Sequence, residues 1–254
     1  MPWNPDIYNQ FKNIRYQPFF DLMNLISSEN LKKAIDVGCG TGGQTHILSE
    51  KFKHAEFLGI DSSAEMLAEA VQFQNENLRF IKIPVEDLIR TDEKYDLIFS
   101  NAALQWSDDH QVLFPELLSL LSEKGQFAVQ MPVQSENILN KILFQLASEE
   151  PFRTQLGSWN RVSPVLSIDE YAQILFDAGL KDLNISVKVY PIVADDYEKL
   201  YQFISGSALI PYVEKLDEVD KEKFITEYKK RISEQFNSFP AIYAFKRLLL
   251  YGRK

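Results

Sequence analysis

Residues 33–131 alternate between short apolar runs and segments of helical periodicity, and this alternation constrains the fold more than any other feature. Apolar runs rich in β-branched and aromatic residues are typical of buried strands, whereas apolar residues repeating at i, i+4 and i+8 indicate helices that cover a sheet. Strands are predicted at 33–38, 56–61, 78–83, 95–100 and 125–131, with helices at 45–52, 63–73 and through Leu113, Leu117 and Leu121. The order predicts a parallel sheet with right-handed crossovers and helices on both faces.

Two serine–glutamate pairs have the spacing of a capping box, in which each side chain satisfies a free backbone N–H of the first helical turn. Ser62 with Glu65 predicts the start of the second helix. Ser167 with Glu170 predicts the start of a later helix that stops at Gly179.

The chain after residue 180 has a different pattern. Residues 184–189 alternate with period 2, and a similar strand over 241–251 closes the chain. The roughly 50 residues between them are mostly helical and too long for a hairpin turn. Residues 134–163 show neither pattern, and we predict that this stretch is irregular.

We therefore predict an α/β fold: a doubly wound, Rossmann-like, mostly parallel seven-stranded sheet with an antiparallel last strand and a helical cap. Residues 1–190 and 240–254 would form the binding domain, and 191–239 would form a cap that acts as a substrate lid. Ligands of such sheets bind beyond the carboxyl ends of the strands.

Composition excludes several classes of protein. The 254 residues are 45% apolar and carry a formal charge of −9, which argues against disorder and against a nucleic-acid partner. Cys39 has no second cysteine to pair with, as expected in a reducing compartment. The sequence has neither a signal peptide at its start nor an apolar run long enough for a membrane span, so we expect a cytoplasmic protein that binds no membrane.

A glycine-rich loop follows the first predicted strand. Gly38, Gly40 and Gly43 fit G-x-G-x-x-G, whereas Gly38, Gly40 and Gly42 fit G-x-G-x-G, so the glycines alone do not name the ligand. Asp36, near the end of that strand, would repel a pyrophosphate and attract an ammonium group. Asp61 ends the second strand, where it can accept hydrogen bonds from both ribose hydroxyls of an adenosine.

These features together describe a nucleoside that carries an amine and no phosphate, which is S-adenosylmethionine. The rival ligand is a nicotinamide dinucleotide, but no second glycine-rich mononucleotide half follows. Cys39 is interpreted as a small residue in a tight loop, because no histidine adjoins it to make it a nucleophile.

Three ordered motifs resemble those of the class I S-adenosylmethionine-dependent methyltransferases. They are Asp36-Val37-Gly38-Cys39-Gly40-Thr41-Gly42, Gly59-Ile60-Asp61-Ser62-Ser63-x-x-Met66 and Tyr95-Asp96-Leu97-Ile98. Within that class, the closest resemblance is to the trans-aconitate methyltransferases. It lies in Trp3-Asn4-Pro5-x-x-Tyr8, Ser100 to Trp106, Asp109-His110, Leu113-Phe114-Pro115 and Val129-Gln130-Met131-Pro132. A malonyl carrier-protein methyltransferase of biotin synthesis is a more distant match.

The resemblance implies roles for particular residues. Asp36 would bind the methionine ammonium, and Asp61 would hold the ribose. The full cofactor-binding set is Asp36, Gly38, Cys39, Gly40, Gly42, Asp61, Ser62, Met66, Val85, Glu86 and Asn101. Gln105, Trp106 and His110 are expected to position the methyl acceptor, and His110 is alternatively a helix cap.

The chain departs from the resembled pattern at two positions. Pro84 stands where the class usually has an acidic residue for the adenine amino group, so either Glu86 or backbone alone holds the adenine. Ile210 stands where the trans-aconitate methyltransferases tend to carry arginine.

Methyl transfer to a carboxylate needs positioning rather than a general base, because a carboxylic acid is already ionised at pH 7. The pocket should offer aromatic walls and one or two cations. Trp3 and Trp159 are further candidates for the wall, and Arg15 and Arg247 match arginine positions of the resembled enzymes. The expected substrate-binding residues are Tyr8, Arg15, Trp106, Tyr212 and Arg247. No spacing of ligand residues suggests a metal.

The sequence thus predicts an S-adenosylmethionine-dependent O-methyltransferase that forms the methyl ester of a small carboxylic acid and releases S-adenosylhomocysteine. A carrier protein is the less favoured acceptor. The alternatives from other classes are a nicotinamide-dependent oxidoreductase and a non-catalytic nucleoside-binding protein.

Overall fold

The computed structural model describes residues 12–254, with side chains from Tyr16 onward, and forms two compact units. The sheet unit comprises residues 18–132, 164–188 and 247–254. The helical unit contains residues 133–163 and 189–246 and, of the described N-terminal residues, 12–17. It therefore includes the predicted cap segment 191–239 together with a stretch from the middle of the chain.

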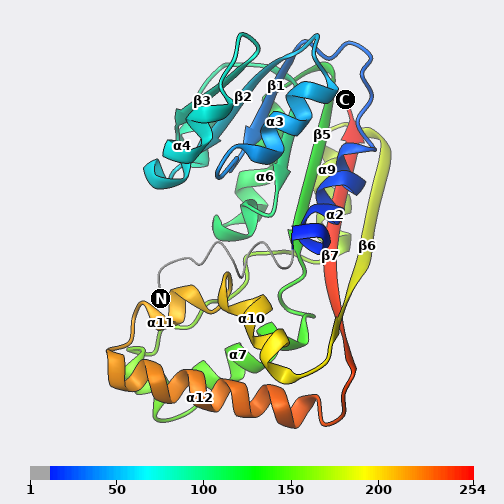
Figure 1. Cartoon of the computed structure of the whole chain (residues 1–254). Coiled ribbons are helices and arrows are strands. Elements are labelled where there is room, and N and C mark those ends of the chain that lie inside the picture. Colours follow the sequence, from blue (N-terminus) through cyan, green and yellow to red (C-terminus); the bar gives the residue numbers. More distant parts are fainter. Residues whose placement is uncertain (1–11) are drawn as a thin grey trace. The chain divides into compact units, whose positions relative to one another are not determined.

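A seven-stranded sheet with strand order β3-β2-β1-β4-β5-β7-β6 is the centre of the sheet unit (Figure 1). Its strands are β1 (Lys33–Val37), β2 (Glu56–Asp61), β3 (Leu78–Lys82), β4 (Tyr95–Asn101), β5 (Leu121–Pro132), β6 (Lys181–Ala194) and β7 (Ala241–Arg253). Strands β1 to β5 pair in parallel, and β7 runs antiparallel to β5. The predicted fold class is confirmed, and the strand order changes direction between β1 and β4.

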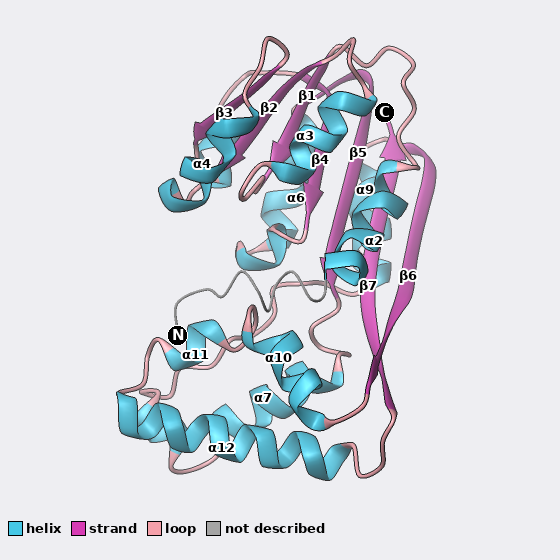
Figure 2. Cartoon of the chain, in the orientation of Figure 1, coloured by secondary structure: helices cyan, strands magenta, loops and turns pink. Residues whose placement is uncertain are grey.

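Helices cover both faces of this sheet (Figure 2). The helical elements of the sheet unit are α2 (Lys12–Met23, which enters this unit at Pro18), α3 (Gly43–Lys51), α4 (Ala64–Ala70), η1 (Val71–Phe73), α5 (Val85–Leu88), η2 (Leu104–Trp106), α6 (His110–Ser119) and α9 (Ile168–Asp177). On one face Phe19 of α2 meets Phe99 of β4, with ring centroids 5.8 Å apart. On the other face Phe114 of α6 meets Phe127 of β5 at the same distance. These aromatic contacts fix the helices to a sheet that is buried on both sides.

The capping box predicted at Ser62 and Glu65 is wrong, because the helix begins one residue later. Ser63 is the N-cap, and its hydroxyl accepts a hydrogen bond from Met66 N at 3.2 Å. Asp61 Oδ1 accepts a hydrogen bond from Ser63 N at 2.9 Å. The end of β2 therefore determines where α4 starts. The capping box at Ser167 and Glu170 is confirmed.

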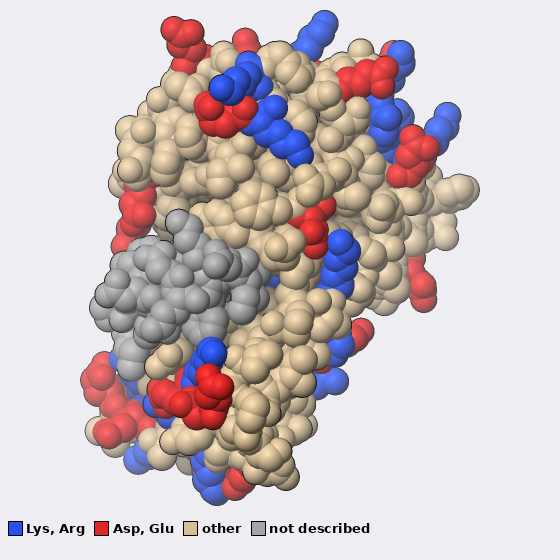
Figure 3. All heavy atoms as spheres, turned by 45° about the vertical axis from the view of Figure 1, so that its right-hand side comes forward, with Lys and Arg blue, Asp and Glu red and all other residues tan. Residues whose placement is uncertain are grey.

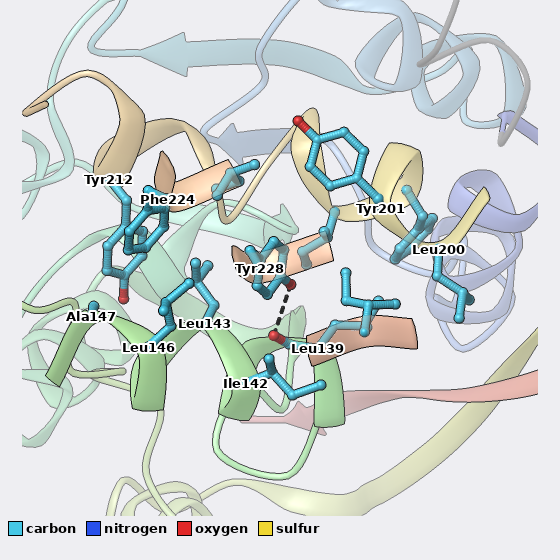
Figure 4. Packing of buried hydrophobic residues seen from close by; sticks show 14 of the residues in the cluster. Leu139, Ile142, Leu143, Leu146, Ala147, Leu200, Tyr201, Tyr212, Phe224 and Tyr228 are labelled. Atoms are coloured by element: carbon cyan, nitrogen blue, oxygen red, sulfur yellow. Dashed lines mark hydrogen bonds between the residues drawn. The ribbon is translucent and has the colours of Figure 1, made fainter. Parts of the chain in front are cut away.

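The helical unit has its own apolar core (Figure 4). Its helices are α7 (Ile138–Ser148), α8 (Phe152–Gln155), α10 (Tyr197–Ser205), α11 (Ile210–Val213) and α12 (Glu218–Gln235). The Tyr228 hydroxyl donates to Leu139 O at 2.9 Å and so satisfies the polar group of a fully buried ring. The prediction of an irregular 134–163 is wrong, since Leu139, Leu143 and Leu146 of α7 are buried in this core.

Acidic and basic side chains are interspersed on the face drawn in Figure 3. Within the helical unit, Arg231 pairs with Glu149 at 2.6 Å and Lys229 pairs with Glu198 at 2.9 Å. Both basic side chains are half-buried, and the Arg231 guanidinium donates to both carboxylate oxygens of Glu149. Across residues 12–254, no helix is long and apolar enough to cross a membrane.

Two neighbouring residues of α7 test the core of the helical unit. Leu143 is 2% exposed and Phe144 is 43% exposed. Leu143→Ala should lower the free energy of unfolding by about 2–5 kcal/mol, because it leaves a cavity, whereas Phe144→Ala should change it by less than ~1 kcal/mol. Urea denaturation of both variants measures this, and equal effects would contradict the packing.

Candidate functional site

The glycine loop connects β1 to α3 at the carboxyl edge of the sheet. Gly38 N and Cys39 N both donate to Ile60 O, at 2.8 and 2.9 Å, which holds the loop against the end of β2. A Cβ at Gly38 would lie 2.1 Å from Ala103 Cβ, so packing alone requires glycine there. At Gly40, where φ is +55°, a Cβ would meet nothing within 4 Å. The loop is therefore packed at Gly38 and open at Gly40, as a loop that passes a ligand needs to be.

Asp36 is a buried carboxylate, 3% exposed, near the end of β1. Its Oδ2 accepts a hydrogen bond from Thr45 Oγ1 at 2.7 Å. Burial raises the pKa of Asp36 to about 7, the Thr45 bond opposes this, and the nearby Asp61 charge adds to it. A cation bound beside Asp36 would stabilise its ionised form, so the site favours a ligand with an ammonium group.

Asp61 joins the end of β2 to the loop. Its Oδ2 accepts from Gly40 N at 2.9 Å, and its Oδ1 accepts from Ser63 N at 2.9 Å. A carboxylate has about four acceptor positions, so each oxygen can still accept a further hydrogen bond. Two fixed oxygens with spare capacity suit a vicinal diol such as that of ribose.

A small apolar cluster lies beside the loop. Cys39, Leu67 and Ala70 are buried in it, and Phe80 packs against them. Burial raises the pKa of the Cys39 thiol, with the Asp36 charge as the second cause, so the thiol stays protonated and is no nucleophile. Together the open side of Gly40, the two carboxylates and this apolar patch fit a nucleoside that carries a cation.

The other predicted cofactor residues stand on the elements that follow β2, β3 and β4. Ser62 is exposed and Met66 is 36% exposed, before and within α4. Val85 is buried and Glu86 exposed at the start of α5, which Pro84 precedes as the N-cap residue. Their cofactor contacts stay predictions.

The carboxyl ends of β4 and β5 carry a row of polar side chains. Asn101 Nδ2 donates to Gln44 Oε1 at 2.8 Å, and Gln130 Nε2 donates to Asn101 Oδ1 at 2.5 Å. Arg247 of β7, 8% exposed, donates from Nη1 to Gln130 Oε1 at 2.9 Å. The structure therefore connects two sequence-predicted residues, Asn101 and Arg247, through Gln130.

The three predicted positioning residues differ in exposure. Trp106 is 43% exposed, whereas Gln105 is buried and donates from Nε2 to Ala102 O at 2.6 Å. His110 is also buried: Nε2 bonds Leu104 O at 2.9 Å, and Nδ1 bonds the Tyr171 hydroxyl at 2.5 Å. Since a carbonyl only accepts, Nε2 carries a hydrogen, and both ring nitrogens are engaged in holding η2 to α9.

The side chains of two predicted substrate residues, Tyr8 and Arg15, and of the wall candidate Trp3 lie outside what the structure describes. Tyr8 and Trp3 precede residue 12, and Arg15 lies in α2 with its side chain outside the described part. Tyr212 belongs to the helical unit, where it is buried and its hydroxyl donates to Asn160 Oδ1 at 2.8 Å. Burial raises the pKa of Tyr212 to about 12. Trp159 packs edge-on against its ring at 5.1 Å.

Sequence reasoning missed three residues of this region, namely Gln44, Thr45 and Gln130. Thr45 carries a signal, because it lies in the first turn of the helix that follows the glycine loop. Gln130 carries a weaker one, as a polar residue within the apolar run from Phe127 to Met131. In the described part of the chain, no group of three or more His, Cys, Asp or Glu side chains is arranged to hold a metal ion.

Comparison with known proteins gives consistent matches. A model of the methyltransferase domain family matches residues 28–179. The trans-aconitate 2-methyltransferase of Deinococcus radiodurans is 40% identical over 260 residues, covering 100% of this chain and 99% of the relative. The YcgJ protein of Bacillus subtilis has a similar structure, with a TM-score of 0.62 at 19% identity, covering 94% of this chain and 98% of that one. Phosphoethanolamine N-methyltransferase 2 of Haemonchus contortus, solved with S-adenosylhomocysteine, has a TM-score of 0.58 at 15% identity, covering 94% and 52%.

The buried Asp36 carboxylate should reduce stability in a pH-dependent way. Its pKa is about 7 in the folded protein, against an ordinary value of 3.8. Between these pH values the folded protein therefore keeps a proton on Asp36 that the unfolded chain has lost. The stability of the unliganded protein therefore falls as pH rises from about 4 to about 7 and stays low above that. Asp36→Asn removes this cost and should stabilise the protein by on the order of 2–4 kcal/mol at pH 8, and hardly at pH 4.

Thermal unfolding as a function of pH measures this difference. Asp92→Asn changes an exposed loop aspartate and serves as the control, with an unchanged profile. If Asp36→Asn were no more stable than wild type at pH 8, ionisation of the buried Asp36 would not lower the free energy of unfolding, and the prediction would be wrong.

Proposed function

Because the chain belongs to the S-adenosylmethionine-dependent methyltransferases, in the family of the trans-aconitate 2-methyltransferases, we propose that it methylates a carboxylate oxygen of trans-aconitate. The observation that carries the proposal is the end-to-end similarity to the Deinococcus radiodurans enzyme of that name. Membership of this family excludes the nicotinamide-dependent oxidoreductase and the non-catalytic binding protein as alternatives. No feature of the described residues favours a carrier protein as acceptor.

The residues at the glycine loop suit the cofactor. Asp36 would bind the ammonium, Asp61 would accept hydrogen bonds from the ribose hydroxyls, and the backbone at Gly40 leaves space for the ligand. When bound, S-adenosylmethionine supplies an activated methyl group and leaves as S-adenosylhomocysteine. The protein has to orient the acceptor and exclude water.

A carboxylate acceptor needs no general base, since its pKa near 4 leaves it ionised at pH 7. This fits His110, whose ring nitrogens are both used in structural hydrogen bonds. Of the two predicted arginines, Arg247 is the one whose side chain the structure describes, and we propose that it binds an acceptor carboxylate. It lies on β7 opposite Pro132, at the carboxyl end of β5. Trp106 is proposed as part of the pocket wall. We also propose, from the sequence alone, that Tyr8, Arg15 and Tyr212 contact the substrate. The proposal that residues 191–239 act as a lid rests on the sequence as well.

Asp61 provides the test of cofactor binding. Asp61→Ala removes both acceptor oxygens and should weaken S-adenosylhomocysteine binding by about tenfold or more, equivalent to about 1.4 kcal/mol. Asp61→Asn keeps one acceptor oxygen and should give an intermediate affinity. Isothermal titration calorimetry measures the dissociation constants, and a change within about threefold for the alanine variant would contradict the ribose assignment.

Arg247 provides the test of the acceptor. Wild-type protein should convert trans-aconitate to its monomethyl ester, detected by mass spectrometry. Arg247→Met should raise the KM for the acid by about 10- to 100-fold, the loss of one charge-assisted contact of about 1.5–3 kcal/mol.

Arg253→Met is the matched control, because Arg253 lies on the same strand, where its guanidinium pairs with Glu29 at 3.8 Å. It should leave KM unchanged. If wild-type protein binds S-adenosylhomocysteine but methylates neither trans-aconitate nor any other small acid, the proposed function is wrong.

A further inference from the structure

Four side chains of the sheet unit form one continuous hydrogen-bonded row. From β7 to α3 the order is Arg247, Gln130, Asn101 and Gln44, with donor–acceptor distances of 2.9, 2.5 and 2.8 Å. Gln130 is fully buried in the middle of the row. Nothing in the proposed chemistry uses Gln130 directly, yet it is the residue through which the acceptor side and the cofactor side are joined.

The strand register explains why the row exists. Asn101 and Gln130 are register partners in β4 and β5, so their side chains point to the same face of the sheet. Gln130 is also the partner of Leu249 in β7, and Arg247 lies two residues away on the same face. The side chains therefore meet because a parallel and an antiparallel neighbour flank the end of β5.

The charge of Arg247 sets the direction of every bond in the row. A guanidinium group only donates, so the oxygen of the Gln130 amide must face it. The nitrogen of Gln130 then faces Asn101 and requires the Asn101 oxygen in return. Asn101 is left to donate to Gln44, in the first turn of α3 directly after the glycine loop. One cation thus orients two amides, and those amides in turn fix the cation.

We propose that Gln130 is a positioning residue for methyl transfer, which holds the acceptor-binding Arg247 at a fixed place relative to the cofactor loop. The inference rests on the proposed function, in which Arg247 binds an acceptor carboxylate, and on the sequence prediction that Asn101 binds the cofactor. A long arginine side chain has many rotamers, and its buried partner removes that freedom before substrate binds. In-line displacement is sensitive to misplacement of the acceptor by about 1 Å, so loss of this partner should affect turnover as well as binding.

Gln130→Met tests the proposal, because methionine has a similar shape and cannot make either hydrogen bond. With trans-aconitate as acceptor, it should lower kcat by about tenfold and raise KM by about tenfold, with S-adenosylhomocysteine affinity within about threefold of wild type. Gln126→Met is the matched control. Gln126 lies four residues earlier on β5, is buried, and hydrogen-bonds Ser27 and Tyr251. This control should lose comparable thermal stability and keep wild-type kcat and KM.

Gln130→Glu separates positioning from a merely structural role. The introduced carboxylate can still accept from Arg247, and Asn101 and Gln44 can both turn over to keep the row continuous with reversed polarity. We expect kcat within about threefold of wild type but a KM raised about tenfold, because the new negative charge offsets that of Arg247. A structural role alone would not split kcat from KM in this way, and this variant keeps the test decisive if the methionine variant does not fold.

The Arg247→Met background provides the last measurement. There Gln130→Met should raise the KM for the acid no further, since Gln130 acts on the acceptor through Arg247. The inference is overturned if Gln130→Met behaves like the Gln126→Met control, or if it raises KM equally in both backgrounds. Turnover by wild-type protein is measured first: if no carboxylic acid is methylated, the proposed function fails, and the inference that rests on it is overturned with it.

Discussion

The burial of the Asp36 carboxylate is the interaction on which the rest of the site depends. An ionised group in the interior of a sheet is costly unless a partner compensates it. Thr45 provides one hydrogen bond, and burial still raises the pKa to about 7. This unfavourable burial occurs beside the glycine loop, which is open at Gly40. A strongly perturbed carboxylate next to an open loop is typical of a binding site for a cation.

The parallel sheet explains why residues far apart in sequence gather at one edge. Strands β1, β2, β4 and β5 end at the same side, so Asp36, Asp61, Asn101 and Gln130 meet there. Strand β7 runs the other way and pairs with β5 as far as Pro132, so the same edge receives Arg247. An acid pair on β1 and β2 and a cation on β7 therefore lie along one edge of the sheet, with β4 and β5 between them. In the proposed function this separation would let a protein of charge −9 bind an anionic acid.

Sequence alone predicted much of this, where local signals and the final structure agree. The run of 56–61 is observed as β2 with the predicted bounds, and the box at Ser167 caps α9 as expected. The cap of α4 was misplaced because the Asp61 carboxylate binds the Ser63 amide, a contact that no propensity encodes. Helix α7 was not predicted, although its buried residues Leu139, Leu143 and Leu146 have helical spacing. The role of Gln130 depends on the pairing of β5 with both β4 and β7, which only the three-dimensional register reveals.

The central claim is that Asp36 recognises the ammonium group of the cofactor, and proton exchange on binding tests it most directly. Calorimetric titration of S-adenosylhomocysteine in buffers of different ionisation enthalpy measures the protons released. If Asp36 ionises on binding, the protein should release a proton near pH 6, and affinity should fall by up to about tenfold per pH unit below about 7. An affinity independent of pH between about 6 and 8, with no proton released, would contradict the account.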